Sequence, residues 1–205
     1  YGTMIFKLYD ATPLHKKNFE NLIEQNYFDG LLFHRVIDGF MIQGGDPDSR
    51  DAKPGELLGE GGPGYTIPAE FVDTIFHKKG VIAAAREGDD TNPEMRSAGS
   101  QFYIVQGKVF TDEDIEKVED RINASRLNKL IVKYQKEAEE KAFETGGIID
   151  YQIIVPEARK KAEEEFKKQG YYKIPDDKRK VYQTIGGTPH LDNAYTVFGE
   201  VIDGL

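Results

Sequence analysis

Arg35 and Gln43 are the residues whose types and surroundings best suit chemistry in this sequence. Both lie in the stretch FHRVIDGFMIQGGD (residues 33–46), where they interrupt apolar and β-branched residues. An arginine offers a permanent charge and a fork of donors, and a glutamine amide can both donate and accept. The pair can therefore hold or stabilise a polar group without forming a covalent bond. On composition alone, a surface arginine beside an edge glutamine is the commoner explanation.

Other kinds of site find little support. The sequence has no cysteine, which excludes disulfides, thiol chemistry and cysteine-ligated zinc. The glycine-rich segment 47–64 lacks the Gly-Lys-Ser/Thr ending of a phosphate loop, and a surface loop bordering the site explains it better. The histidines have no metal-ligand spacing: they are His15, His34, His77 and His190. We expect neither a metal nor a cofactor, and we expect His34 to be structural.

Length and charge set further limits. A chain of 205 residues suits one domain or slightly more. Its net charge of −9 disfavours nucleic acid as a partner, and no apolar run is long enough to predict a membrane span. Residues 108–187 hold 17 basic and 17 acidic residues, so the excess negative charge lies in the rest of the chain.

The elements expected to position Arg35 and Gln43 are the two strands of a hairpin. Residues 33–37 alternate as a strand, Asp38-Gly39 is typical of a two-residue turn, and residues 40–43 form the returning strand. Strict alternation puts Met41 and Gln43 on one face and Phe40 on the other. Phe40 must therefore lie at the edge of the hairpin to share a pocket with Met41; otherwise it belongs to the core.

Further strands are expected on both sides of this hairpin. They cover residues 3–9, 65–71, 80–86, 100–105 and 195–201. A helix is predicted over 14–26, with Phe19, Leu22 and Ile23 on one buried face.

The periodicity changes to that of a helix at Lys108. Thr111 followed by acidic residues is typical of a helix N-cap, and Gly146-Gly147 ends the pattern. Pro156 is expected to start a second helix over 157–169, with Gly170 as its C-cap, and a third is predicted near 176–184. We thus expect a β body, 1–107 and 188–205, with a helical insertion over 108–187.

Four segments together resemble the cyclophilin family of peptidyl-prolyl isomerases. They are FHRVIDGFMIQGGD (33–46), GPGYTIPAEF (62–71), GSQFYIV (99–105) and HLDNAYTVFGEV (190–201), in the order of the family. The resemblance covers nearly the whole β body, and the insertion is similar to that of larger bacterial members. It implies a mainly β fold, a closed antiparallel eight-stranded barrel with a capping helix. A second capping helix and the last strand are expected to be missing after Leu205.

The resemblance also implies the site. The catalytic arginine falls on Arg35, assisted by Gln43. The residues expected to bind substrate are Phe40, Met41, Ala84, Ala85, Arg86, Gln101, Tyr103, His190, Leu191 and Tyr195. From the residues alone, Phe40, Tyr103 and Leu191 could equally be core, and the side chain of Arg86 could be solvated.

Three of these positions depart from the best-known eukaryotic form. Tyr103 stands where phenylalanine is usual, His190 where a tryptophan lies at the drug-binding rim, and Tyr195 where a histidine lines the pocket. Weakened cyclosporin binding is therefore expected, because a large rim aromatic is lost.

The function implied is isomerisation of X–Pro bonds in proline-containing peptides and in unfolded or folded client proteins, which would assist folding. A proline-peptide binding or chaperone module with little turnover is the alternative. The insertion is either a helical hairpin packed on the barrel, a surface controlling substrate access, or an assembly module. Export to the bacterial periplasm or envelope is slightly favoured over the cytoplasm by the same resemblance.

Overall fold

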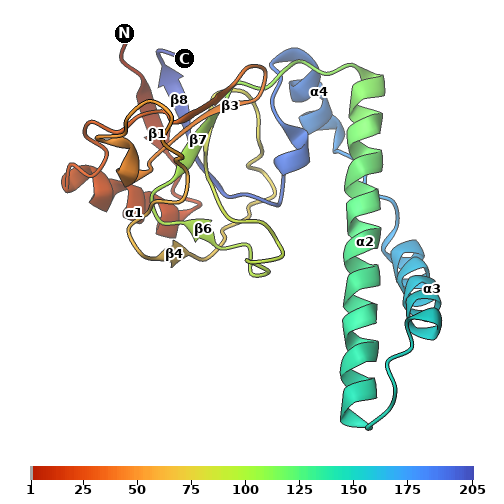
Figure 1. Ribbon diagram of the computed structural model, residues 1–205. Coiled ribbons are helices and arrows are strands. Elements are labelled where there is room, and N and C mark those ends of the chain that lie inside the picture. The colour runs from red at the N-terminus through yellow and green to blue at the C-terminus, as the bar shows by residue number, and fades with distance from the viewer. Residues whose placement is uncertain (1) are drawn as a thin grey trace. The chain divides into compact units, whose positions relative to one another are not determined.

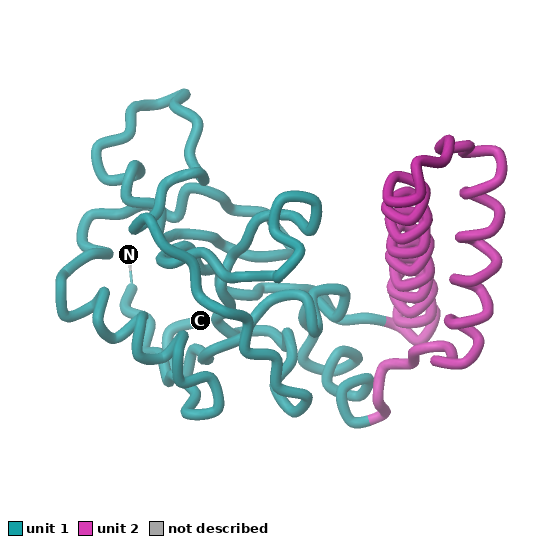
Figure 2. The backbone as a smooth tube through the Cα atoms, turned by 90° about the horizontal axis from the view of Figure 1, so that it is seen from below, with its two compact units in different colours: residues 1–110, 177–205 teal, residues 111–176 magenta. Residues whose placement is uncertain are grey.

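The computed structural model describes residues 2–205, which form two compact units (Figure 2). Unit 1 runs to Phe110 and resumes over Asp177–Leu205, and unit 2 is Thr111–Asp176. Most of helix α4 (Asp176–Thr184) therefore lies in unit 1, although the sequence pattern placed it with the insertion. The reason is Tyr182, which is fully buried and whose carbonyl accepts a hydrogen bond from the backbone N–H of Phe110 (3.0 Å).

Unit 1 is built on a six-stranded antiparallel sheet with the order β1-β8-β5-β7-β3-β2 (Figure 1). The strands are β1 (Ile5–Leu8), β2 (Arg35–Ile37), β3 (Met41–Gly44), β5 (Val81–Ala84), β7 (Phe102–Val105) and β8 (Val197–Asp203). A separate two-stranded ribbon pairs β4 (Thr66–Ile67) with β6 (Ser97–Ala98). Short 3-10 turns, η1 (Pro47–Ser49) and η2 (Pro189–Leu191), complete the unit.

The sheet is not closed by the strands of the described residues. β1 pairs only with β8, and β2 pairs only with β3, so the order of strands ends at these two edges. The mainly antiparallel architecture is as expected, but the closed eight-stranded barrel is not seen. A barrel requires every strand to have two hydrogen-bonded neighbours, and β1 and β2 each have one.

The core of unit 1 has two clusters, as expected when strand residues alternate between faces. One cluster joins α1 (Pro13–Glu24) to the sheet through the buried side chains of Phe19, Phe102 and Phe198. The other contains Met41, Tyr103 and Val197, with Phe40, Leu191 and Tyr195 partly buried against it. In α1, Phe19 and Leu22 are buried as predicted, whereas Ile23 is 52% exposed and the prediction for it was wrong.

The hairpin that carries Arg35 and Gln43 has a three-residue turn instead of the two-residue turn expected. Ile37 pairs directly with Met41, which leaves Asp38, Gly39 and Phe40 in the turn. Gly39 has a φ of 67°, a conformation that glycine adopts without steric cost. Phe40 is thus released from the strict alternation of the strand.

Unit 2 is a pair of helices, α2 (Asp112–Glu144) and α3 (Tyr151–Gln169). α2 begins with the predicted cap: the side chain of Thr111 accepts from the N–H of Asp114, and Asp114 reciprocates. α3 begins at Tyr151 instead of after Pro156, because Asp150 caps it and Pro156 is accommodated inside the helix. Among residues 2–205, no helix is long and apolar enough to cross a membrane.

Candidate active site

Strand register brings Arg35, Gln43 and Tyr103 into one row. Arg35 pairs with Gln43 across β2 and β3, Gln43 pairs with Tyr103 across β3 and β7, and Tyr103 pairs with Ala83 on β5. Residues directly opposite each other in an antiparallel sheet share a face. Met41, two residues before Gln43, is therefore on this face as well, and it is almost completely buried.

A chain of hydrogen bonds orients the polar end of this row. Nη1 of Arg35 donates to Oε1 of Gln43 (3.2 Å), and Nε2 of Gln43 donates to Oε1 of Gln101 (3.0 Å). Nε2 of Gln101 in turn donates to the carbonyls of Gly59 (2.7 Å) and Gly61 (2.8 Å). The segment around these glycines therefore borders the site, as expected. The exposed guanidinium of Arg35 is held through Gln43 and retains further donors for a ligand.

Beside Arg35 lies a small cavity of about 160 Å³. It is lined by Arg35, Phe40, Met41, Gln43, Ala85, Arg86, Tyr103, Leu191 and Tyr195. Aromatic and aliphatic side chains form most of its wall, and the polar groups of Arg35 and Gln43 lie on one side. Phe40 reaches this cavity from the turn, which was the condition that the sequence pattern set for it. A compact apolar ring next to a polar amide is the shape of ligand that suits this arrangement.

Arg86 is a structural part of the wall and not a solvated residue. Its side chain is 5% exposed, Nε donates to the carbonyl of Ala194 (2.6 Å), and Nη2 bonds to Asp89 (2.7 Å). Its guanidinium carbon lies 4.7 Å from the ring centroid of Tyr195. This cation–π contact helps to hold Tyr195 at the cavity. The interpretation of Arg86 as solvated was therefore wrong.

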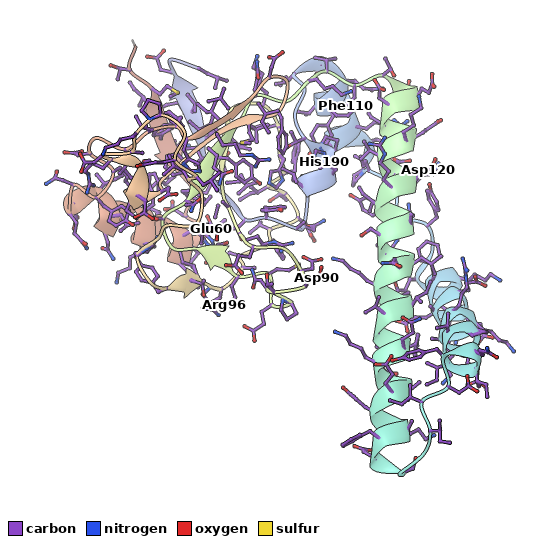
Figure 3. All side chains as sticks on the ribbon, viewed as in Figure 1. Glu60, Asp90, Arg96, Phe110, Asp120 and His190 are labelled. Atoms are coloured by element: carbon purple, nitrogen blue, oxygen red, sulfur yellow. The ribbon has the colours of Figure 1, made fainter. Side chains whose placement is uncertain are left out.

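Three of the predicted substrate-binding residues lie outside the small cavity. Ala85 lines the cavity, and successive residues of a strand face opposite sides of the sheet. The side chain of Ala84 therefore faces the cluster that packs on α1. Gln101 is bonded to Gln43 and lines the larger groove that adjoins the cavity. His190, labelled in Figure 3, lies in η2 and is exposed. Its ring stacks on that of Phe40 with 5.7 Å between ring centroids.

A larger and more polar groove of about 710 Å³ adjoins the cavity and shares Gln43, Ala85 and Arg86 with it. Its lining comes from residues 59–66 and from residues between 85 and 101, including Glu60 and Arg96, both labelled in Figure 3. A peptide whose apolar ring occupied the small cavity would have room for neighbouring residues here.

Sequence reasoning missed a buried polar network behind the cavity. The phenol oxygen of Tyr103 lies 3.0 Å from Nε2 of His77, and Nδ1 of His77 lies 3.0 Å from Oδ1 of Asp192. Burial raises the pKa of Tyr103 well above its ordinary value, and the nearby Tyr195 and Asp192 add to this. Asp192 directly follows the cavity residue Leu191 and lies within a quoted motif, but no spacing in the sequence connects it to His77.

His34 is the histidine next to Arg35. Both of its ring nitrogens are buried without a hydrogen-bond partner among the described residues, and burial lowers its pKa. It is not among the residues that line the cavity. A structural role, as expected for it, stays a prediction.

Comparisons with known proteins identify the family to which the chain is similar. The family model of "Cyclophilin type peptidyl-prolyl cis-trans isomerase/CLD" matches residues 1–128. A protein of Staphylococcus haemolyticus named as a peptidyl-prolyl cis-trans isomerase is 31% identical over 99% of this chain and 72% of its own length. A Streptococcus pyogenes protein named as a bifunctional phosphatase/peptidyl-prolyl cis-trans isomerase is 30% identical over 99% of this chain, which spans only 30% of that protein.

The fold is also similar to that of a solved structure. It is the Cryptosporidium parvum cyclophilin type peptidyl-prolyl cis-trans isomerase, determined in the presence of the dipeptide Ala-Pro. That structure superposes with a TM-score of 0.53 at 20% identity, over all of this chain and 75% of the other. The chain belongs to the cyclophilin-type family of peptidyl-prolyl cis-trans isomerases.

Proposed function

We propose that this chain accelerates rotation about X–Pro peptide bonds and that Arg35 stabilises the twisted amide. The observation that carries the proposal is the position of an oriented guanidinium at the side of a cavity fit for a proline ring. No nucleophile or base is required, because isomerisation breaks no covalent bond of the substrate.

The chemistry follows from the amide. Its delocalised bond resists rotation by about 18–20 kcal/mol. At the top of the barrier the nitrogen lone pair is localised and becomes a good acceptor, whereas in either planar isomer it is not. A donor aimed at this nitrogen therefore binds the transition state more tightly than the substrate, which is the condition for catalysis. Arg35 supplies such donors at any ordinary pH.

The remaining residues hold the substrate around the rotating bond. Phe40, Met41, Tyr103 and Leu191 would enclose the pyrrolidine ring, and the apolar wall favours the twisted amide, which is less charge-separated than the planar one. Gln43 keeps Arg35 in place, because its carbonyl accepts from Nη1 while its amide is anchored on Gln101. In the adjoining groove, Ala85 and the backbone near it would align the residues next to proline.

The test is the rate of cis–trans conversion of a proline tetrapeptide in a protease-coupled assay. We expect Arg35→Ala to lower kcat/KM about 100- to 1,000-fold, as for removal of one preorganised transition-state donor. Arg35→Lys should remain well below wild type, since it keeps the charge but loses the fork. Arg159→Ala is the matched control, because Arg159 is an exposed arginine of unit 2 whose side chain is 67% accessible.

The outcomes separate two functions. Acceleration by the wild type that is lost in Arg35→Ala supports the enzyme, whereas peptide binding without acceleration by the wild type supports a module that only holds proline segments. Assistance to the folding of client proteins follows if refolding limited by proline isomerisation is accelerated in the same way. Cyclosporin should bind weakly, because His190 is smaller than tryptophan and already stacks on Phe40.

A further inference from the structure

We propose that His77 is a positioning residue of the proline pocket, which accepts the hydroxyl hydrogen bond of Tyr103 and keeps this hydroxyl out of the cavity. The inference rests on the proposed function, because it assumes that the cavity lined by Tyr103 holds the proline ring.

The geometry ties one wall of the cavity to two other segments. His77 lies shortly before β5 and is 1% exposed, and its ring stacks on that of Tyr103 with 6.1 Å between centroids and 14° between planes. Its Nε2 is 3.0 Å from the Tyr103 oxygen. Oδ1 of Asp192 faces both Nδ1 of His77 (3.0 Å) and the backbone N–H of His77 (2.9 Å). Oδ2 of Asp192 accepts from the hydroxyl of Tyr182 on α4 (2.7 Å).

These partners determine where the hydrogens lie. The carboxylate of Asp192 can only accept, so Nδ1 of His77 must carry a hydrogen. In the neutral imidazole Nε2 is then an acceptor. With His77 neutral, the hydroxyl of Tyr103 donates to Nε2, and its hydrogen is directed toward His77, which does not line the cavity. The raised pKa of Tyr103 agrees with a phenol that stays a donor.

The bond to His77 gives the buried hydroxyl of Tyr103 a hydrogen-bond partner outside the apolar pocket. A buried hydroxyl without a partner is unfavourable by about 1–3 kcal/mol. If His77 could not accept, the hydroxyl would have to find water or a polar group on the cavity side, where the proline ring has to bind. A phenylalanine at position 103 would not need His77 at all. The role of His77 is thus conditional on the hydroxyl of Tyr103.

Because His77 is needed only when residue 103 carries a hydroxyl, removal of that hydroxyl should rescue a His77 variant, as measured by steady-state kinetics on the proline tetrapeptide. We expect His77→Leu to lower kcat/KM about tenfold, chiefly through KM, because a buried hydroxyl loses its partner. Asp192 keeps two donors in this variant, the backbone N–H of residue 77 and Tyr182. Tyr103→Phe alone provides the reference value, and kcat/KM of the double variant His77→Leu/Tyr103→Phe should rise from that of His77→Leu to that of Tyr103→Phe, since both partners are then apolar.

His15→Leu is the matched control. His15 is also a buried histidine between a carboxylate and a hydroxyl, but it does not line the cavity. Its substitution should leave kcat/KM of the folded protein within about twofold of wild type, because no cavity residue loses a partner. The proposal is overturned if His77→Leu keeps the kcat/KM of wild type, or if the double variant is no better than His77→Leu. Loss of stability without loss of kcat/KM would assign His77 a purely structural role.

A second measurement needs no substitution of His77. In protein labelled with ¹⁵N-histidine, NMR should find Nδ1 of His77 protonated and Nε2 unprotonated at neutral pH, and Tyr103→Phe should shift the Nε2 resonance. A hydrogen on Nε2 would contradict the proposal, because Tyr103 would then accept and its hydroxyl hydrogen would be free to point elsewhere. If the wild type does not accelerate isomerisation, the proposed function fails, whereas the NMR result and the peptide affinities of the same variants still test His77.

Discussion

Unit 1 contains two buried histidines with the same arrangement of partners. A carboxylate bonds to Nδ1 and to the backbone N–H of the histidine, and a hydroxyl lies at Nε2: Glu70 and Ser97 for His15, Asp192 and Tyr103 for His77. The arrangements differ in what the hydroxyl belongs to. Ser97 lies in the β4–β6 ribbon, whereas the ring of Tyr103 lines the candidate proline pocket. The same arrangement of carboxylate, histidine and hydroxyl can therefore stabilise the fold at His15 and position a residue of a ligand site at His77.

The His15 arrangement also replaces a missing helix cap. Thr12 provides no side-chain cap for α1, but the carboxylate of Glu70 accepts from the backbone N–H groups of Leu14 (3.1 Å) and His15 (3.0 Å). A carboxylate at this end of a helix is favoured both by the unpaired N–H groups and by the helix dipole. Glu70 thus joins the start of α1 to the segment after β4.

Substitution of Glu70 should have the largest effect of the variants that separate the two histidine sites, because it should lower stability without lowering kcat/KM. Glu70→Ala leaves two backbone donors and His15 without their acceptor, so we expect the free energy of unfolding to fall by about 3 kcal/mol. At temperatures where the variant is folded, kcat/KM should change less than about twofold, because no cavity residue loses a partner. Urea unfolding and the proline-peptide assay measure the two effects. A large loss of kcat/KM in folded Glu70→Ala would contradict the view that the His15 site serves only the fold.

The pH dependence of stability should sharpen the description of His15. Burial lowers the pKa of His15 in the folded protein, against a smaller opposite effect of Glu70. Between the two pKa values the unfolded chain binds the proton more readily, so the free energy of unfolding should decrease as pH falls below about 6.5, the unperturbed value. His34 contributes with the same sign, because burial lowers its pKa too.

Thermal unfolding between pH 7.5 and pH 5 tests this sign. His15→Leu should show a weaker decrease in stability over this range than wild type, since one of the two histidines with a lowered pKa is gone. An equally steep decrease in both proteins would show that His15 does not titrate in this window.

The smallest effect is expected from Tyr182→Phe, at the far end of the His77 arrangement. Asp192 would lose one of its donors but keep the bonds to Nδ1 and to the backbone N–H of His77. We expect the free energy of unfolding to fall by about 0.5–1.5 kcal/mol. kcat/KM should change by no more than about twofold, because His77 still accepts from Tyr103. A loss as large as that of His77→Leu would mean that α4 takes part in holding the pocket.

The sequence predicted some features of the fold well and others poorly. Local signals were reliable where one segment supplied all the partners, as at the Thr111 cap of α2 and the Gly170 cap of α3. The start of α3 was missed because Asp150 caps the helix before Pro156. Local signals also failed where distant contacts decide, as for α4, which belongs to unit 1 because Tyr182 packs there. The closure of the sheet also depends on long-range pairing, and β1 and β2 each pair on one side only.

The candidate site shows the same division. Arg35, Gln43 and most of the cavity residues were named from motifs, because alternation and register place them without further information. Ala84 was predicted to bind substrate together with Ala85 and Arg86, but its side chain packs in the cluster that contacts α1, because successive residues of a strand face opposite sides. The role of Arg86 in the wall could not be derived, since its partners Ala194 and Tyr195 are more than a hundred residues away.

By itself, the sequence determined the family, the hairpin that presents Arg35 and Gln43, and the boundary at which helices replace strands, because these depend on residue type and short spacing. The tertiary structure alone decided that Phe40 turns into the cavity, that Tyr103 directs its hydroxyl to His77, and which carboxylate each buried histidine meets. Buried polar groups must find partners wherever the folded chain brings them, and for His15 and His77 these partners lie between 26 and 115 residues away.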